Sequence, residues 1–362
     1  MKAVASTLTD ISREDLIKAR AHELGFQACG MAEAGPVNAD TATAFKQWIA
    51  ANHHGDMGYM ARNVDKRLDP TLLVPGCRSL IVVAMSYYPA RRQPNSTYQL
   101  SYYAYGRDYH EVIKERLYQL IDYLRGVYDQ QPIANGGSTE TIVARAFVDT
   151  APILERYWAQ QAGIGWIGKN HQLIVPHAGS YFFLGIIATS ARLMPDAPCP
   201  NRCGTCHKCL DACPTGALHQ DGMDARRCLS YLTIEQKGPI PSAIAERMNG
   251  RIYGCDSCQQ ACPWNRFAIP TTESSFSPSE ELLSLTPDDW RQLTPERYAA
   301  LFPHSAIARA GYEGLMRNIH SLTARDIDFP STKQNHISKS LDKKSLLNSP
   351  SFLPNGRKKE RK

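Results

Sequence analysis

Nine of the eleven cysteines in this chain of 362 residues fall between Cys199 and Cys262. Eleven cysteines are about 3% of the chain, well below the density of a disulfide scaffold. Cys29 and Cys77 lie elsewhere, in apolar surroundings typical of buried structural cysteines. The clustering indicates a metal site, and it limits this segment to a small module folded around its ligands.

The first run of cysteines has the spacing C-x2-C-x2-C-x3-C-P and consists of Cys203, Cys206, Cys209 and Cys213. This is the run of bacterial ferredoxins, in which three cysteines bind one 4Fe–4S cluster and the fourth binds its neighbour. The second run is incomplete because Ile252 stands where its first cysteine would be expected. Cys228, further upstream, is the available substitute.

Together the two runs supply eight thiolates, the number that two 4Fe–4S clusters require. The crossed pattern predicts one cluster bound by Cys203, Cys206, Cys209 and Cys262. It predicts the other bound by Cys213, Cys228, Cys255 and Cys258. We therefore expect a ferredoxin-like module with two clusters over residues 196–268.

Structural zinc is the alternative interpretation. Zinc sites usually pair two C-x2-C knuckles across a longer spacer, without a third cysteine in step or a Cys-Pro ending. Cys199, four residues before Cys203, could compete as a ligand, but we interpret it as a spare thiol. A ferredoxin alone would not need the long segment before the module, so that segment has to contain the electron acceptor.

The segment before the module alternates helical and strand-like patterns. Residues 79–85 and 141–148 read as strands, and residues 108–125 form an amphipathic helical pattern. We predict an α/β (α+β) domain with a mixed sheet over residues 1–195. Short helices are expected over 269–324, followed by a disordered basic tail over 325–362.

The net positive charge of the chain comes from that tail. It carries 10 of the 41 basic residues and four of the 35 acidic ones, so residues 1–324 hold 31 of each sign. A surface for a polyanion must therefore be a local patch. No apolar run approaches the roughly 20 residues that a bilayer-spanning helix needs, and the N-terminus lacks the pattern of a secretory or twin-Arg signal. We expect a soluble cytoplasmic protein without membrane contact.

Several long strings resemble the epoxyqueuosine reductase family. They are DTAPILER at 149–156, AGIGWIGKN at 162–170, CPTGAL at 213–218, RIYGCDSCQ at 251–259, GRDYH at 106–110 and RRCLSYL at 226–232. The resemblance implies a reductive-dehalogenase-like cobalamin-binding domain joined to the ferredoxin-like module. It also implies the last step of queuosine biosynthesis, in which the epoxide oxygen of epoxyqueuosine is removed at the wobble position of tRNA.

The resemblance further implies a path for electrons and protons. An external donor such as a flavodoxin or ferredoxin would reduce the clusters, the clusters would reduce cobalamin, and Asp149 would be the proton donor. The strand that ends at Asp149 is followed by Thr150 and Pro152, which are suited to open the next helix. The alternative interpretation of Asp149 is a helix cap or an ion-pair partner of Arg145 or Arg156.

The family resemblance also suggests which residues contact the cofactor, and local charge suggests which residues contact tRNA. The resemblance places Arg67, Leu173, Leu184, Ser230, Asp256 and Ser257 at the cobalamin, as well as Asp149. Arg67 could otherwise form a surface ion pair with Asp65 or Asp69, and the two leucines could be ordinary core residues. For tRNA we expect a patch that includes Lys237, Arg247 and Arg251, with Arg226 and Arg227, interleaved with Tyr231 and Tyr253.

Two other functions compete with this one. The chain could be a cobalamin and iron–sulfur reductase of a small molecule, of the reductive-dehalogenase type. It could also be a non-catalytic electron carrier or cobalamin-handling protein. Asp149 in a full cofactor domain argues against the second. We expect a monomer in each case.

Overall fold

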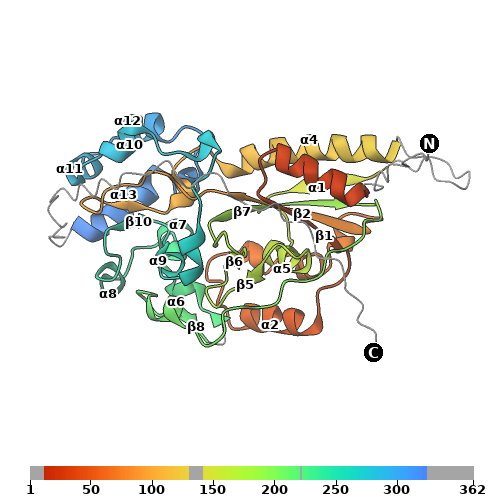
Figure 1. The fold of residues 1–362 in the computed structure, drawn as a ribbon. Coiled ribbons are helices and arrows are strands. Elements are labelled where there is room, and N and C mark those ends of the chain that lie inside the picture. The colour runs from red at the N-terminus through yellow and green to blue at the C-terminus, as the bar shows by residue number, and fades with distance from the viewer. Residues whose placement is uncertain (1–11, 130–141, 221, 324–362) are drawn as a thin grey trace, which may run out of the picture. The chain divides into compact units, whose positions relative to one another are not determined.

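A four-stranded sheet lies at the centre of the first half of the chain (Figure 1). The computed structural model describes residues 12–129, 142–220 and 222–323, so the expected tail over 325–362 lies outside the described residues. The strands stand in the order β1 (Ala28–Glu33), β2 (Ser79–Ser86), β7 (Phe182–Thr189) and β4 (Ala144–Phe147).

The sheet is antiparallel, and the prediction of a mixed sheet was wrong. β2 pairs with β7 along its whole length, from Ser79 opposite Thr189 to Ser86 opposite Phe182. β1 and β4 also pair with their neighbours in antiparallel fashion. Helices between strands suggested parallel crossovers, but here the long connections return each strand beside its neighbour in the opposite direction.

Alternation along the buried strands divides the core between the two faces of the sheet. Ile81, Val83 and Met85 belong to one apolar cluster, and Leu80, Val82 and Ala84 belong to another. This is the period of two expected of a strand. The strand is buried throughout because each face is covered.

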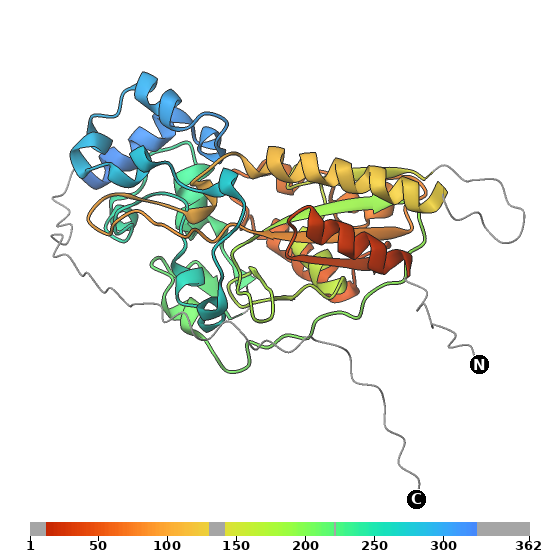
Figure 2. The same ribbon diagram turned by 45° about the horizontal axis from the view of Figure 1, so that its top comes forward.

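Helices on opposite faces complete these two clusters. α1 (Arg13–Glu23) and α4 (Tyr109–Asp129) pack on the first face, as Figures 1 and 2 show. Ser12 caps α1 by accepting the N–H of Asp15 at 3.1 Å. α5 (Glu155–Gln161) packs on the second face. The same region contains α2 (Ala39–Ala50), α3 (Val64–Leu68), β5 (Trp166–Ile167) and β6 (Leu173–Ile174).

The cysteine-rich segment is made of short elements. They are α6 (Lys208–Asp211), β8 (Leu218–His219), β9 (Gly222–Met223), α7 (Leu229–Ile234), α8 (Ser242–Ala245), β10 (Arg251–Tyr253) and α9 (Ser257–Gln260). β10 pairs in parallel with the distant β3 (Gln99–Leu100), where the Ser101 N–H donates to the Tyr253 carbonyl at 2.8 Å. This pairing joins the segment to the first half of the chain.

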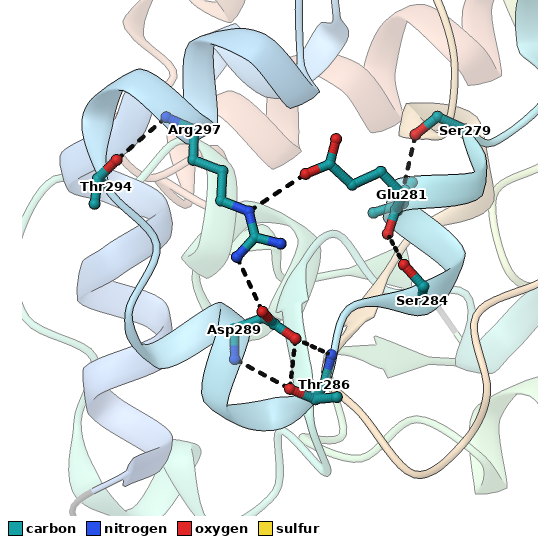
Figure 3. A network of polar contacts seen from close by, with 8 residues as sticks. Ser279, Glu281, Ser284, Thr286, Asp289, Thr294 and Arg297 are labelled. Atoms are coloured by element: carbon teal, nitrogen blue, oxygen red, sulfur yellow. Dashed lines mark hydrogen bonds and ion pairs between the residues drawn. The ribbon is translucent and has the colours of Figure 1, made fainter.

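The C-terminal helices are α10 (Glu280–Ser284), α11 (Pro287–Arg291), α12 (Pro295–Leu301) and α13 (Gly311–Thr323). Arg297 connects the first three, since it contacts Glu281 at 3.3 Å and Asp289 at 2.9 Å (Figure 3). The buried Asn318 of α13 donates to the carbonyls of Thr233 and Ile252, both at 2.8 Å. α13 thus packs onto the cysteine-rich segment.

Short 3-10 turns connect these elements at Gly58–Met60, Pro70–Leu72, Tyr102–Ala104, Ala225–Arg227, Pro263–Phe267, Ser274–Phe276 and Ala306–Arg309. In the described part of the chain, no helix is both long and apolar enough to cross a bilayer. The domain boundaries at 195, 268 and 324 stay predictions.

Candidate cluster-binding and active site

The thiols of the cysteine-rich segment fall into two groups by their mutual electrostatic effects. Burial raises the pKa of Cys209, and the thiolates of Cys262, Cys203 and Cys206 raise it further. These four residues form the first set. Their grouping brings Cys262 from the second run to the three cysteines of the first run, as the crossed pattern predicts.

The second set consists of Cys213, Cys228, Cys255 and Cys258. Burial raises the pKa of Cys258 well above its usual value, and the other three thiolates add to this effect. Burial and Cys255 raise the pKa of Cys228 to about 11. Four thiols that disfavour one another's ionisation in the free chain would release their protons to solvent when a cluster binds, since thiolates are the ligands. The donor chemistry of each set fits a 4Fe–4S cluster.

Cysteine side chains of the second set form hydrogen bonds with neighbouring groups. The Ala217 N–H donates to Cys213 Sγ at 3.2 Å, and the thiol of Cys255 donates to Ser257 Oγ at 3.3 Å. The backbone N–H of Ser230 lies against the Cys228 sulfur, where it favours the thiolate. Ser230 and Ser257 therefore stand beside cysteines of the second set, and their contact with cobalamin stays a prediction. Among the described residues, no group of three or more histidine, cysteine, aspartate or glutamate side chains is arranged to bind a single metal ion.

Asp256 has a structural partnership of its own. Its carboxylate accepts hydrogen bonds from the Ser101 hydroxyl and the Tyr102 N–H, both at 2.9 Å. Burial raises its pKa. The side chain thus connects the loop of the second set to the β3 segment. Both of its oxygens already have protein donors.

Asp149 lies in a bend after β4, with its side chain exposed. Its φ is 51°, a left-handed value that is uncommon for a residue other than glycine. The carboxylate accepts a short hydrogen bond from the Tyr109 hydroxyl, and the Asp149 N–H donates to Glu155 Oε1 at 2.7 Å. These partners replace the ion pair with Arg145 or Arg156 that was the alternative interpretation.

The helix after Asp149 begins later than its sequence suggested. α5 starts at Glu155, with Leu154 at the N-cap and no side-chain cap. Thr150 and Pro152 therefore lie in the loop, and the prediction that they open the helix was wrong. The left-handed Asp149 turns the chain away from a helical path, and this delays the helix until Glu155.

Tyr109 and Glu155 are site residues that sequence reasoning missed. The Tyr109 ring stacks on Phe183 of β7, with centroids 4.2 Å apart and planes 4° from parallel. Burial and the Asp149 charge raise the pKa of Tyr109 and of Glu155 well above their usual values. Both residues occur in the strings that carry the family resemblance, and this was the signal that could have identified them. Their positions in the sequence do not by themselves indicate a contact with Asp149.

Arg67 is buried beneath the same site. One nitrogen, Nη2, donates to the Tyr59 carbonyl at 3.2 Å, whereas its buried Nε has no partner among the described residues. Burial lowers its pKa, and Tyr59 and Glu155 partly oppose this effect. Ion pairs of Arg67 with Asp65 or Asp69 are absent from the described contacts. An unpartnered buried donor is what a polar cofactor group would satisfy.

Leu173 and Leu184 are buried in the second apolar cluster, together with Phe147 and Ile153 on either side of the Asp149 loop. The two leucines therefore line the core beneath this loop. Their strands, β6 and β7, fix them there. Leu68, the residue after Arg67, belongs to the same cluster, so the unpartnered Arg67 donor adjoins buried apolar side chains. This combination fits a large ring with polar substituents, such as cobalamin.

The basic residues expected to bind tRNA are placed unequally. Lys237 and Arg247 are exposed, and Arg251 is half-buried with Nη1 donating to the Met248 carbonyl at 3.3 Å. Arg226 is held by Asp224 through two hydrogen bonds of 2.9 and 2.8 Å, and Arg227 donates to the Thr215 carbonyl.

The two interleaved tyrosines are core residues. Tyr231 is 7% exposed, and its hydroxyl accepts the Asp56 N–H at 2.9 Å. Tyr253 is 1% exposed, and its hydroxyl donates to the Ala306 carbonyl at 2.6 Å. Their rings are covered by protein, so neither can stack on a base in this structure.

Comparison with known proteins gives consistent results. Residues 202–265 match a family described as a 4Fe-4S double cluster binding domain, and residues 67–150 match one described as epoxyqueuosine reductase QueG, DUF1730. The epoxyqueuosine reductase of Cellulophaga algicola is 42% identical over 315 residues, which cover 87% of this chain and 99% of that protein.

Two solved structures are similar over most of the chain. An epoxyqueuosine reductase with a tRNA-Tyr epoxyqueuosine-modified stem loop is 28% identical with a TM-score of 0.76, covering 86% of this chain and 80% of that one. The Bacillus subtilis enzyme, with its catalytic aspartate loop swung out of the active site, is 27% identical with a TM-score of 0.74 over the same shares. These matches confirm the α/β fold and the two-cluster module. The ligand assignment stays a prediction.

Proposed function

The chain belongs to the epoxyqueuosine reductase family, and on that premise we propose the residues and the second cofactor through which it acts. It is an oxidoreductase that reduces epoxyqueuosine to queuosine. The observation that carries this conclusion is identity of 42% across nearly the whole length of a named relative. The cysteine sets supply what the reaction needs first, a route for electrons.

The reaction consumes two electrons and two protons, breaks both carbon–oxygen bonds of the epoxide and releases water and an alkene. Each cluster passes one electron at a time. The eight thiols of the first and second sets are the ligands in our proposal. The electrons come from an external one-electron donor, for which a flavodoxin or ferredoxin has suitable chemistry.

We propose cobalamin as the second cofactor, held over Leu173 and Leu184 with a polar substituent on Arg67. The support is the unpartnered Arg67 Nε next to the apolar cluster below the Asp149 loop. Bound cobalamin would supply a reducible cobalt centre with strong nucleophilicity toward polarised carbon. The backbone around Ser230, Asp256 and Ser257 would then separate it from the second set.

Asp149 is the proton donor in this proposal. Its carboxyl group is exposed at the end of β4 and can reach a substrate, while the Tyr109 hydroxyl fixes its orientation. Opening an epoxide generates an alkoxide, which a carboxylic acid within hydrogen-bond distance can protonate. The Bacillus subtilis relative, whose catalytic aspartate lies on a loop, supports this assignment.

The substrate is tRNA, as in the relative solved with a modified stem loop. Lys237, Arg247 and Arg251 are our candidates for contacts with its phosphates, Lys237 and Arg247 because their charges are exposed. Since mature tRNA is a cytoplasmic molecule, we place the enzyme in the cytoplasm. We propose that it acts as a monomer.

Nucleoside mass spectrometry of tRNA tests the proposal. Cells that lack this protein and any redundant enzyme should accumulate epoxyqueuosine, and the wild-type chain should restore queuosine. Asp149→Asn should bind both cofactors yet fail to restore it. Normal queuosine in the deletion strain would redirect the search to a small-molecule reductase, and full complementation by Asp149→Asn would exclude the proton-donor role.

A further inference from the structure

The Asp149 loop is anchored at its far end, where Ile153 and Leu154 pack in the second apolar cluster, whereas Asp149 and Thr150 at its near end are exposed. Residues 149–154 form neither helix nor strand, and the loop's internal backbone hydrogen bonds are short-range, from Thr150 to Val148 and from Ile153 to Ala151. The left-handed φ of Asp149 is disfavoured for a residue with a Cβ atom. Such a conformation persists only where the surroundings enforce it.

Two side chains from fixed elements meet at this residue. Glu155 is the first residue of α5, and this helix is fixed because its residues Tyr157 and Trp158 are buried in the second apolar cluster. Its Oε1 accepts the Asp149 N–H at 2.7 Å. From α4, Tyr109 donates to the Asp149 carboxylate. Glu155 therefore holds the backbone of Asp149 and also lies against its carboxyl group, while Tyr109 holds the carboxylate from the other element.

We propose that Glu155 is a positioning residue, which accepts the Asp149 N–H and so keeps the Asp149 carboxylate against the Tyr109 hydroxyl. This inference rests on the proposed function, in which Asp149 is the proton donor. Without the Glu155 acceptor, the N–H loses its protein partner and the left-handed conformation loses its support. The Asp149 end of the loop then moves away from the Tyr109 hydroxyl, and proton delivery fails while substrate binding continues.

A simpler role for Glu155 competes with this one. Acidic side chains in the first turn of a helix are stabilising because they face the positive end of the helix dipole. That role depends on the charge of Glu155, whereas the positioning role depends on an oxygen that can accept the Asp149 N–H. Substitutions that separate charge from acceptor position therefore discriminate the two roles.

Three variants of Glu155 make this separation. Glu155→Gln keeps an acceptor oxygen in place without an ionisable carboxyl group, Glu155→Met removes the acceptor, and Glu155→Asp keeps the carboxyl group but withdraws the acceptor by one methylene. Glu14→Met is the matched control, because Glu14 Oε1 also accepts a backbone N–H, that of Met194 at 2.8 Å, and makes no contact with Asp149 among the described contacts. All four would be studied as holoenzyme with measured iron and cobalamin content.

Amide hydrogen exchange of the peptide that spans residues 148–154 is the first measurement. We expect at least about tenfold faster exchange in Glu155→Met and Glu155→Asp, and wild-type exchange in Glu155→Gln and Glu14→Met. Steady-state kinetics with epoxyqueuosine tRNA is the second. Glu155→Met should lower kcat by on the order of 10²-fold with KM nearly unchanged, and Glu155→Gln should recover kcat to within about threefold of wild type.

Wild-type exchange in both Glu155→Met and Glu155→Asp would overturn the proposal. So would equal losses in Glu155→Gln and Glu155→Met, which would assign Glu155 a charge role. If Glu155→Met loses its cofactors, Glu155→Asp decides the question, because it retains the carboxyl group. The hydrogen-exchange result does not depend on whether Asp149 is the proton donor. A fully active Asp149→Asn would therefore disprove the proton donor separately.

Discussion

Replacing Cys228 by serine tests the least regular feature of the cluster module. In the ferredoxin pattern the first cysteine of the second run would stand at position 252, where this chain has Ile252. Ile252 is fully buried in β10, and Cys228 stands at the N-cap of α7 beside Cys255 and Cys213. A serine hydroxyl ionises far less readily than a thiol, so it is a poor ligand for a cluster iron.

The expected magnitude follows from the two sets of thiols. Two 4Fe–4S clusters contain about eight iron atoms, and loss of the second cluster leaves about four. Protein purified without oxygen should show this halving in iron and acid-labile sulfide per chain, and one fewer signal in the reduced electron paramagnetic resonance spectrum. Deoxygenation of tRNA should stop, because the route for electrons is interrupted.

Cys199→Ser is the control. Cys199 is buried near Cys203 and Cys262, in a small cluster with Trp166 and Ile174, so it is the nearest competitor for the first set. This variant should retain about eight iron atoms per chain. A full iron complement in Cys228→Ser, combined with a half complement in Cys199→Ser, would refute the ligand assignment.

Three further predictions follow from the active site and the core. Tyr109→Phe removes a hydrogen bond to the Asp149 carboxylate of about 1.5–3 kcal/mol, so kcat should fall about 10- to 100-fold; an unchanged kcat would remove Tyr109 from the site. Arg67→Met should weaken cobalamin binding by a similar factor in an absorbance titration, and wild-type affinity would place the cofactor elsewhere. Gly30→Ala should destabilise the fold by about 1–3 kcal/mol in urea unfolding, because a Cβ there would stand 2.0 Å from the Ala162 carbonyl oxygen; wild-type stability would show that the two backbones can separate.

The predictable parts of this protein are those encoded by local spacing. The cysteine runs anticipate both sets of thiols, because ferredoxin-type turns bring residues three apart around one cluster. Ser12 anticipates the start of α1, since a cap needs only its own neighbours. The Ser79–Ser86 strand is evident from its continuous apolar run.

The remaining features depend on contacts between distant segments. Tyr109 and Asp149 are 40 residues apart, and nothing in either segment specifies their hydrogen bond. Tyr231 and Tyr253 stand among basic residues in the sequence, yet the fold buries both rings. The prediction of a mixed sheet was wrong for the same reason. A helix between two strands does not determine whether the second strand runs parallel or antiparallel to its neighbour in the sheet.

The pairing of β3 with β10 has a consequence for how the chain matures on the ribosome. Gln99 and Leu100 leave the ribosome about 150 residues before Arg251 and Tyr253, their partners. At a synthesis rate of about 5–20 residues per second, the earlier strand waits roughly 8–30 s for the later one. During that interval the ligand loop of the second set, with Cys255, Cys258 and Asp256, is still being made. The second set can therefore receive its cluster only after Cys258 has been made, and until then the β3 segment has no β10 strand to pair with.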